Sequence, residues 1–514
     1  MKRLIIPLIT IFLWFAGPAC AKPGDAENGE RIYAQRCVWC HGEEGDGEGA
    51  AAERLNPPPR DFTAAQYKIK TTAFDDDFAN DDNMFRMIRD GMPGTAMPGW
   101  SDVLSEQEMW DLVWYIKTLA GLEEEPLGAD MDYGTRIESS PESIARGKEL
   151  FLEDDRCVEC HGKEGKGDAA KGLKDDSGFR TWPRNLTKPW TFRASNDPKD
   201  IFARISTGIP STQMPAFGDP ASDKVLSVED RWHVANYVNS LAKTDKVVAP
   251  ENTVVKAEKF EGPLPGSPDD PQWEQTTPTT FFLVPQIVGK ERFFTPSNDT
   301  VTARAAFNEG TIAILLEWDD RTRSIPGDET AGEISDPELA QDSIAIQLPV
   351  VIPEGSEKPY FGMGDVSHPV NMWQWKSGTT ETPESVKLYN AMGFTEIEIR
   401  DAAASGIEAR GIYENGTWKV LMTRPRKPAD SEKDIEFSDG EFIPIAFAAW
   451  DGSNSEQGSR HTMTTWYWLL LKPDTGTGPA IAAVIVVLLL LAIQFWWVRS
   501  ATPAQTTADR REQA

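Results

Sequence analysis

Two five-residue motifs hold the residues with the most specific chemistry. They are Cys37-Val38-Trp39-Cys40-His41 and Cys157-Val158-Glu159-Cys160-His161. The spacing Cys-x-x-Cys-His is typical of c-type haem attachment, in which two thiols add across the vinyl groups of the porphyrin. The histidine that follows then ligates the iron.

A zinc half-site and a redox dithiol share the Cys-x-x-Cys spacing. Neither requires the following histidine, which is present in both motifs. The sequence therefore predicts two covalent haem c groups, with His41 and His161 as proximal ligands.

Each motif is followed by a Met-Pro pair that offers a sixth iron ligand. Met97 lies 60 residues after Cys37, and Met214 lies 57 residues after Cys157. A thioether ligand raises the reduction potential, and a closed six-coordinate iron transfers electrons without binding substrate. We expect Met97 and Met214 to be these ligands. Met92 is the rival of Met97, but Ile209 stands at its place in the second half.

The two motifs belong to an internal repeat, because residues 85–98 match residues 202–215 at a constant offset of 117. Helical patterns open each half at 28–35 and 144–152 and close it at 106–119 and 228–241. Loops rich in Gly and Pro are expected between them. We expect cytochrome domains at 22–121 and 142–243, joined by a linker at 122–141. On the last helix, His233 is interpreted as an ordinary, partly buried histidine.

Both halves resemble class I c-type cytochromes in their haem motifs, Met-Pro loops and aromatic closing helices. The resemblance implies two all-α domains in which the first and last helices cross beside the haem. It also implies that a proline carbonyl holds each proximal histidine, from Pro57, Pro58 or Pro59 in the first domain and from Pro183 in the second. Arg60 and Arg184 would bind haem propionates, the alternative being surface ion pairs.

Both ends of the chain carry apolar segments. Residues 1–21 read as a secretory signal ending at Ala19-Cys20-Ala21; a lipoprotein acylated at Cys20 is the weaker alternative. Residues 476–499 are predicted to form one transmembrane helix, because about 20 apolar residues span a bilayer. Basic residues in the tail 500–514 predict that it is cytoplasmic. The bulk of the chain would then lie on the periplasmic side of the inner membrane.

The composition is acidic, with a formal net charge of −29. This argues against nucleic acid as a partner, since nucleic acid selects basic surfaces. It suits a basic soluble electron carrier such as a cytochrome, because complementary fields speed encounter. The acidic surface is equally consistent with a role in solubility alone.

A third domain is expected at 272–475, after a polar linker at 244–271. Alternating patterns predict antiparallel strands, with hairpins at 301–318 and, around Asn415-Gly416, at 407–423. These features indicate an all-β sandwich or barrel.

This domain resembles the haem b domain of the ethylbenzene dehydrogenase gamma-subunit family, in the segments around Phe361-Gly362-Met363-Gly364 and Arg460-His461-Thr462-Met463. The resemblance implies one non-covalent haem b ligated by Met363 and, where the family has lysine, by His461. His368 is the main competing ligand, followed by Met372 and Met463. Without an axial pair, this would be a docking domain only.

The leading hypothesis is a membrane-anchored, non-catalytic electron-transfer subunit of a respiratory oxidoreductase. Its partners would be iron–sulfur and molybdenum subunits of the dimethyl sulfoxide reductase superfamily, as in a nitrite oxidoreductase-like complex. One alternative is a di-haem peroxidase, which needs an open or displaceable iron ligand. Another is a tethered cytochrome c whose β domain only docks partners.

Overall fold

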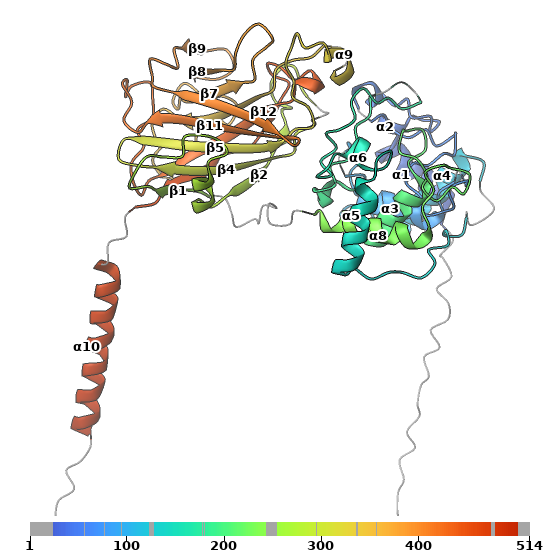
Figure 1. Ribbon diagram of the computed structural model, residues 1–514, viewed down its shortest axis with the longest axis horizontal. Coiled ribbons are helices and arrows are strands. Elements are labelled where there is room, and N and C mark those ends of the chain that lie inside the picture. The colour runs from blue at the N-terminus through green and yellow to red at the C-terminus, as the bar shows by residue number, and fades with distance from the viewer. Residues whose placement is uncertain are drawn as a thin grey trace, which may run out of the picture.

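The computed structural model describes residues 24–55, 57–76, 78–93, 95–122, 128–176, 178, 180–242, 254–293, 296–335, 338–355, 357–473 and 478–501. A helical region comes first, a large β domain follows, and one separate helix ends the described chain (Figure 1). This order confirms the expected fold class. The expected signal segment 1–21 and nearly all of the tail 500–514 lie outside the described residues.

The helical region has two units with the same order of helices. The first contains α1 (Ala26–Arg36), α2 (Val38–His41), the short 3-10 helix η1 (Ala52–Arg54), α3 (Asp81–Asp90) and α4 (Glu106–Leu119). The second contains α5 (Pro141–Leu152), α6 (Val158–His161), the 3-10 helix η2 (Pro189–Thr191), α7 (Pro198–Thr207) and α8 (Val228–Ser240). The expected opening and closing helices are therefore present. Helices α3 and α7 lie where only loops were expected.

Polar side chains fix where the crossing helices begin. Asp25 accepts hydrogen bonds from the backbone N–H groups of the first turn of α1. Ser105 and Glu108 form a reciprocal capping box at α4, and Ser227 caps α8. These bonds satisfy backbone donors that the helix itself leaves unpaired.

A glycine lets the opening and closing helices of each unit touch backbone to backbone. A Cβ atom on Gly29 would lie 2.1 Å from the carbonyl oxygen of Asp111, and one on Gly147 would lie 2.0 Å from that of His233. A side chain at Gly29 would push α1 away from α4, and a side chain at Gly147 would push α5 away from α8. The helix crossing that the resemblance implied is therefore present in both units, and it depends on these two glycines.

The β domain is built from strands of one continuous, folded sheet. They are β1 (Val254–Lys259), β2 (Thr279–Phe282), β3 (Val284–Pro285), β4 (Thr300–Phe307), β5 (Thr311–Asp319), β6 (Ser343–Pro349), β7 (Val370–Lys376), β8 (Ser385–Ala391), β9 (Ile397–Arg400), β10 (Glu408–Glu414), β11 (Thr417–Pro425), β12 (Phe442–Trp450), β13 (Thr462–Met463) and β14 (Tyr467–Leu471). Three short helices, η4 (Pro271–Gln275), α9 (Ala331–Ile334) and η5 (Gly452–Asn454), lie between strands. The path runs β10-β11-β5-β4-β1-β14-β12-β6-β7-β8-β9.

The sheet differs from the expected antiparallel arrangement at β1. This strand pairs in parallel with both β4 and β14. It also lies inside the segment 244–271 that was expected to be a linker, so the β domain begins at or before Val254 in the described chain. The alternating pattern of six residues between polar stretches was too short to identify a strand.

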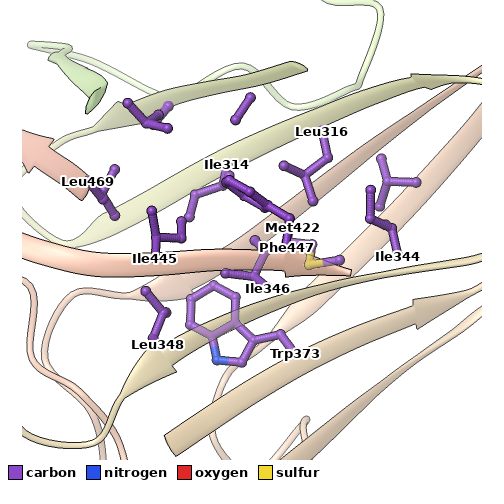
Figure 2. Close-up of a cluster of buried hydrophobic side chains, with 14 of the residues drawn as sticks. Ile314, Leu316, Ile344, Ile346, Leu348, Trp373, Met422, Ile445, Phe447 and Leu469 are labelled. Carbon is purple, nitrogen blue, oxygen red and sulfur yellow. The ribbon is translucent and has the colours of Figure 1, made fainter. Parts of the chain in front are cut away.

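The sheet folds over a shared apolar core. Side chains from β5 and β11 meet side chains from β6, β7, β12 and β14 (Figure 2). The labelled core residues are Ile314, Leu316, Ile344, Ile346, Leu348, Trp373, Met422, Ile445, Phe447 and Leu469. The hairpin predicted at Asn415-Gly416 pairs β10 with β11, and both turn residues have positive φ, as such turns require.

The described chain ends in α10 (Gly478–Ala501), which stands apart from the β domain in Figure 1. By length and composition, residues 483–500 are able to cross a membrane. The apolar side chains from Val484 to Val498 are exposed to their surroundings. A solvent-exposed helix of this composition is unfavourable in water, which agrees with the predicted membrane anchor.

Replacing Gly147 with alanine should lower the free energy of unfolding of the second helical unit by about 1–3 kcal/mol, the usual cost of overpacking. The new Cβ overlaps the carbonyl oxygen of His233. Gly332→Ala is the matched control, because a Cβ there meets nothing within 4 Å. Thermal unfolding of the purified chain, followed by circular dichroism, provides the comparison. Equal transitions for both variants would contradict the backbone contact.

Candidate haem-binding sites

The two Cys-x-x-Cys-His motifs adopt the same local structure. Each forms one turn of helix, α2 or α6, in which the histidine N–H donates to the carbonyl of the first cysteine, at 2.9 Å in the first unit and 2.8 Å in the second. The described cysteines, Cys37, Cys40, Cys157 and Cys160, form no disulfides. Both thiols of each motif therefore remain available for thioether bonds.

Each motif histidine is held through its Nδ1 atom. Nδ1 of His41 lies 3.0 Å from the carbonyl oxygen of Arg60, and Nδ1 of His161 lies 3.0 Å from that of Arg184. Burial lowers the pKa of both imidazoles. A neutral ring that donates from Nδ1 presents a lone pair on Nε2, which is the arrangement a haem iron requires.

The carbonyl acceptors correct one expectation. The resemblance implied Pro57, Pro58 or Pro59 in the first unit and Pro183 in the second. In both units the acceptor instead belongs to the arginine that directly follows the last of these prolines. A proline fixes its own φ angle, so we attribute the orientation of the next carbonyl to the rigid residue before it.

The Met-Pro loops are also built alike. The carbonyl of Met97 accepts from the N–H of Met92, and that of Met214 accepts from the N–H of Ile209, at 3.0 and 3.1 Å. A threonine hydroxyl locks each loop, since Thr95 Oγ1 and Thr212 Oγ1 each donate to the carbonyl that opens the loop.

The sequence repeat aligns Thr95 with Thr212, but it did not reveal what either residue does. Their presence at the same position of both halves was the available sign of a shared role. The backbone N–H of each predicted methionine donates to the threonine of its own loop, at 3.1 Å for Met97 and 3.2 Å for Met214. The rival Met92 stands at the start of its loop, where the second unit has isoleucine. Met97 and Met214 therefore occupy equivalent positions in the two loops.

A cavity of about 740 Å³ surrounds the second motif. It is within the range of roughly 300–1,000 Å³ typical of ligand and cofactor pockets. Cys157, Cys160, His161 and Met214 all line it. The proximal histidine, both thiols and the expected sixth ligand therefore converge on one space, which fits a haem group.

This cavity is closed by all three domains. The first helical unit contributes Pro57, Lys68 and Ile69, and the β domain contributes Phe282, Leu283, Asp299 and Arg321. No sequence pattern indicated this arrangement, because these residues of the first unit and the β domain lie more than 80 residues from the motif at 157–161.

Arginine side chains gather at the cavity, and some of their buried N–H groups lack partners. Burial, together with the positive charges of Arg193 and Arg321, lowers the pKa of Arg184 to about 9. Burial and the nearby Arg60 also lower the pKa of Arg193. The Nε atoms of Arg193 and Arg204 are buried and have no hydrogen-bond partner among the described residues. The two carboxylates of a porphyrin would supply acceptors for such groups, so the residues present fit haem.

Arg60 and Arg184 therefore remain predicted propionate ligands, and the same geometry adds Arg193 and Arg321 as candidates. The alternative of surface ion pairs does not fit Arg184, because burial dominates its environment. Arg193 and Arg321 lacked any recognisable motif. Only the folded contacts identify them.

The predicted haem b ligands have different immediate surroundings. Met363 packs beside the cluster of Val370, Ala391, Ala446 and Trp466. The ring of His461 lies 4.7 Å from the ring of Trp450, and its Nδ1 lies 3.0 Å from the carbonyl oxygen of Gly458. Burial lowers the pKa of His461 to about 4, so the ring is neutral. Among the described residues, no cluster or bond joins Met363 to His461, and their pairing stays a prediction.

An exposed apolar surface extends between these two loops. The backbone N–H of Gln286 donates to the carbonyl of His461, and Ile287 and Val288, which follow it, are about half exposed. Phe394 lies close to both Gly289 and Gly362. The surface thus reaches from the His461 loop to the residue preceding Met363, which is what a flat apolar cofactor would need.

The competing ligands have other surroundings. The ring nitrogens of His368 lie 3.5 Å from a Glu357 carboxylate oxygen and 3.3 Å from one of Asp365. Met372 packs beside the same cluster as Met363. Met463 lies on β13, opposite Ala448. His233 bonds to the Ser143 hydroxyl at 2.9 Å, as expected of an ordinary histidine.

Comparison with known proteins identifies the families of two parts of the chain. A cytochrome c family profile matches residues 26–120 and 144–242, and an ethylbenzene dehydrogenase profile matches residues 270–396. Cytochrome c55X of Paracoccus denitrificans is 32% identical over 122 residues, which are 23% of this chain and 97% of that protein. The chain belongs to the cytochrome c family and carries an ethylbenzene dehydrogenase-type domain, as both resemblances indicated.

The names of two further relatives describe them as subunits of reductases. A Haloferax mediterranei protein, named as a respiratory nitrate reductase heme subunit, is 28% identical over 198 residues, 38% of this chain and 64% of that protein. The chlorate reductase subunit gamma of Ideonella dechloratans is 24% identical over 205 residues, 40% of this chain and 78% of that protein. The chain thus spans just under two thirds of the length of the first relative.

Replacing Met214 with alanine should lower one haem midpoint potential, because the thioether favours ferrous iron. Met97→Ala should do the same to a different haem. Met92→Ala is the matched control, because Met92 occupies the loop position that Ile209, which has no sulfur, occupies in the second unit. Potentiometric titration of the purified chain measures all three variants. Unchanged potentials in Met97→Ala or Met214→Ala would show that the ligand is misassigned.

Proposed function

We propose that the chain is the haem-bearing, gamma-type electron-transfer subunit of a respiratory oxidoreductase complex. The observation that carries the proposal is the cavity around His161 and Met214, which is walled by the first cytochrome unit on one side and by the β domain on the other. Bound haem supplies reversible one-electron chemistry, and such a wall lets electrons pass between domains without leaving the protein.

Contacts between the two helical units support a fixed relay. The guanidinium of Arg86 in α3 donates to the Asp200 carboxylate in α7 at 2.8 Å, and that of Arg204 donates to the carbonyl of Lys68 at 3.1 Å. Both hydrogen bonds lie near residues that line the cavity. They hold the first unit against the second.

The second unit is also joined to the β domain. Trp190 donates its indole N–H to Asp299 at 3.1 Å, and the ammonium group of Lys188 pairs with the same carboxylate. Lys188 also lies 3.6 Å from Asp319. Partly buried charge pairs are costly to break, so these contacts hold the second unit against the β domain.

The names of the two subunit relatives favour a molybdenum and iron–sulfur partner, in a complex of the dimethyl sulfoxide reductase superfamily such as a nitrite oxidoreductase-like enzyme. The β domain would exchange electrons with that partner through haem b at Met363 and His461. The helical units would serve a soluble cytochrome or another carrier. Helix α10 would anchor the chain in the inner membrane, with the other domains on the periplasmic side.

A di-haem peroxidase and a pure docking role are the alternative functions. The peroxidase needs an open iron position, whereas both units carry the same methionine loop. The docking role needs no haem in the β domain. The haem content and the peroxide activity of the full chain therefore distinguish the three functions.

The purified full chain should contain two haem groups that resist acidified acetone and one that acetone extracts, as measured by pyridine haemochrome spectra. The double variant Cys157→Ala/Cys160→Ala should lose one resistant haem and keep the extractable one. We expect no peroxide turnover above that of free haem. Two resistant haems alone would remove haem b, and rapid peroxide turnover would favour the peroxidase.

Purification from detergent-solubilised membranes should yield a complex with molybdenum and non-haem iron, as measured by metal analysis. Deleting residues 478–501 should release that complex into the soluble fraction. Recovery of the chain without molybdenum would contradict the proposed partner, and continued membrane association would contradict the anchor.

A further inference from the structure

Three buried aspartates from separate connections of the β domain converge beside the second haem cavity. Asp320 follows β5, Asp342 precedes β6, and Asp451 follows β12. One carboxylate oxygen from each lies within 4.8 Å of those of the other two. Each residue is at most 3% exposed, and Asp320 and Asp451 also line the cavity.

The surrounding protein does not balance this charge. Glu456 is also buried and adds a fourth carboxyl group. This carboxyl group accepts a hydrogen bond from the backbone N–H of Asp451. Arg321 and Lys171 interact electrostatically with Asp320 and Asp451, but neither cation forms an ion pair with these four carboxyl groups among the described residues. Lys171 donates instead to backbone carbonyls, at 2.6 Å to that of Asp168.

A separate observation is that polar atoms here lack partners. Oδ2 of Asp320 is buried without a hydrogen-bond partner among the described residues. So are both amide atoms of Asn298, which is 2% exposed and lines the same cavity. The next residue back, Ser297, donates its hydroxyl to Asp451. A buried oxygen without a partner destabilises the fold, and a bound cation would provide that partner.

The remaining lone pairs are oriented by backbone donors. Asp342 accepts from the N–H groups of Ser324 at 2.7 Å and Gly452 at 2.8 Å, and from the indole of Trp418 at 2.9 Å. Asp451 accepts from the N–H of Ser453 at 2.8 Å. These bonds fix the orientation of the two carboxyl groups.

We propose that Asp320, Asp342 and Asp451 bind one calcium ion. The donors are all hard oxygens with no histidine or cysteine, which disfavours transition metals. Calcium takes carboxylate oxygens at about 2.3–2.6 Å, so two ligands of one ion lie at most about 5 Å apart. Magnesium prefers to retain several waters and suits this buried, protein-lined site less well.

The ion would tie the ends of β5, β6 and β12 together at the wall of the haem cavity. Arg321, directly after Asp320, is one of the residues that line this cavity. Calcium would therefore fix the β-domain side of the junction with the second cytochrome unit. This inference does not depend on the proposed function, because it concerns the assembly of the β domain alone.

The test uses the haem-loaded full chain in detergent, stripped with EGTA and freed of chelator by gel filtration. Calcium chloride is then titrated in the presence of excess magnesium chloride, which saturates the acidic surface. We expect one calcium ion per chain by metal analysis and a calcium-dependent rise in the unfolding temperature. EGTA should reverse that rise.

Asp342→Asn and Asp451→Asn should each weaken calcium binding by at least about tenfold, since even outer partners of a metal site contribute that much. Asp269→Asn, an exposed carboxylate of the same domain, is the matched control and should bind as the wild type does. Absence of calcium binding or stabilisation in the wild type overturns the proposal, whether or not the variants fold. So does unchanged affinity in both buried variants.

Discussion

The cationic cavity around His161 is the constraint on which the arrangement of the domains depends. Arg184 lies in a buried space near Arg193 of its own unit and Arg321 of the β domain, and burial together with these two positive charges lowers its pKa. Positive charges this close are unfavourable without an anion between them. A porphyrin attached to Cys157 and Cys160 would bring its carboxylates to this cluster, so the cofactor and the interdomain contacts stabilise each other.

The first and second cytochrome units share one design but differ in their neighbours. Helix crossings at Gly29 and Gly147, carbonyl-bound histidines and threonine-locked methionine loops occur in both. At the second unit, the β domain contributes residues to the haem cavity. A duplicated redox domain thus occupies a central position in the chain, and the ion pairs of Lys188 and Arg86 fix it there.

Local patterns predicted the parts of the structure that depend on neighbouring residues. The Cys-x-x-Cys-His turns, the closing helices and the Asn415-Gly416 hairpin are of this kind. Helix α3 was missed because charged and polar residues dominate it, and only Met84 and Ile88 bury an apolar face. Strand β1 was missed because its stability comes from parallel pairing with β4 and β14, both distant from it in sequence. The three-domain cavity and the aspartate cluster depend on residues far apart in sequence, which no local pattern records.

The most direct test of the account is whether a β-domain charge controls a cytochrome haem. In Arg321→Gln, the loss of a positive charge at the cavity should stabilise ferric iron and lower the midpoint potential of one haem c, the one that Cys157→Ala/Cys160→Ala removes. Arg323→Gln, two residues away and exposed, should leave all potentials unchanged. A titration in which Arg321→Gln matches the wild type would contradict a haem site shared between the domains.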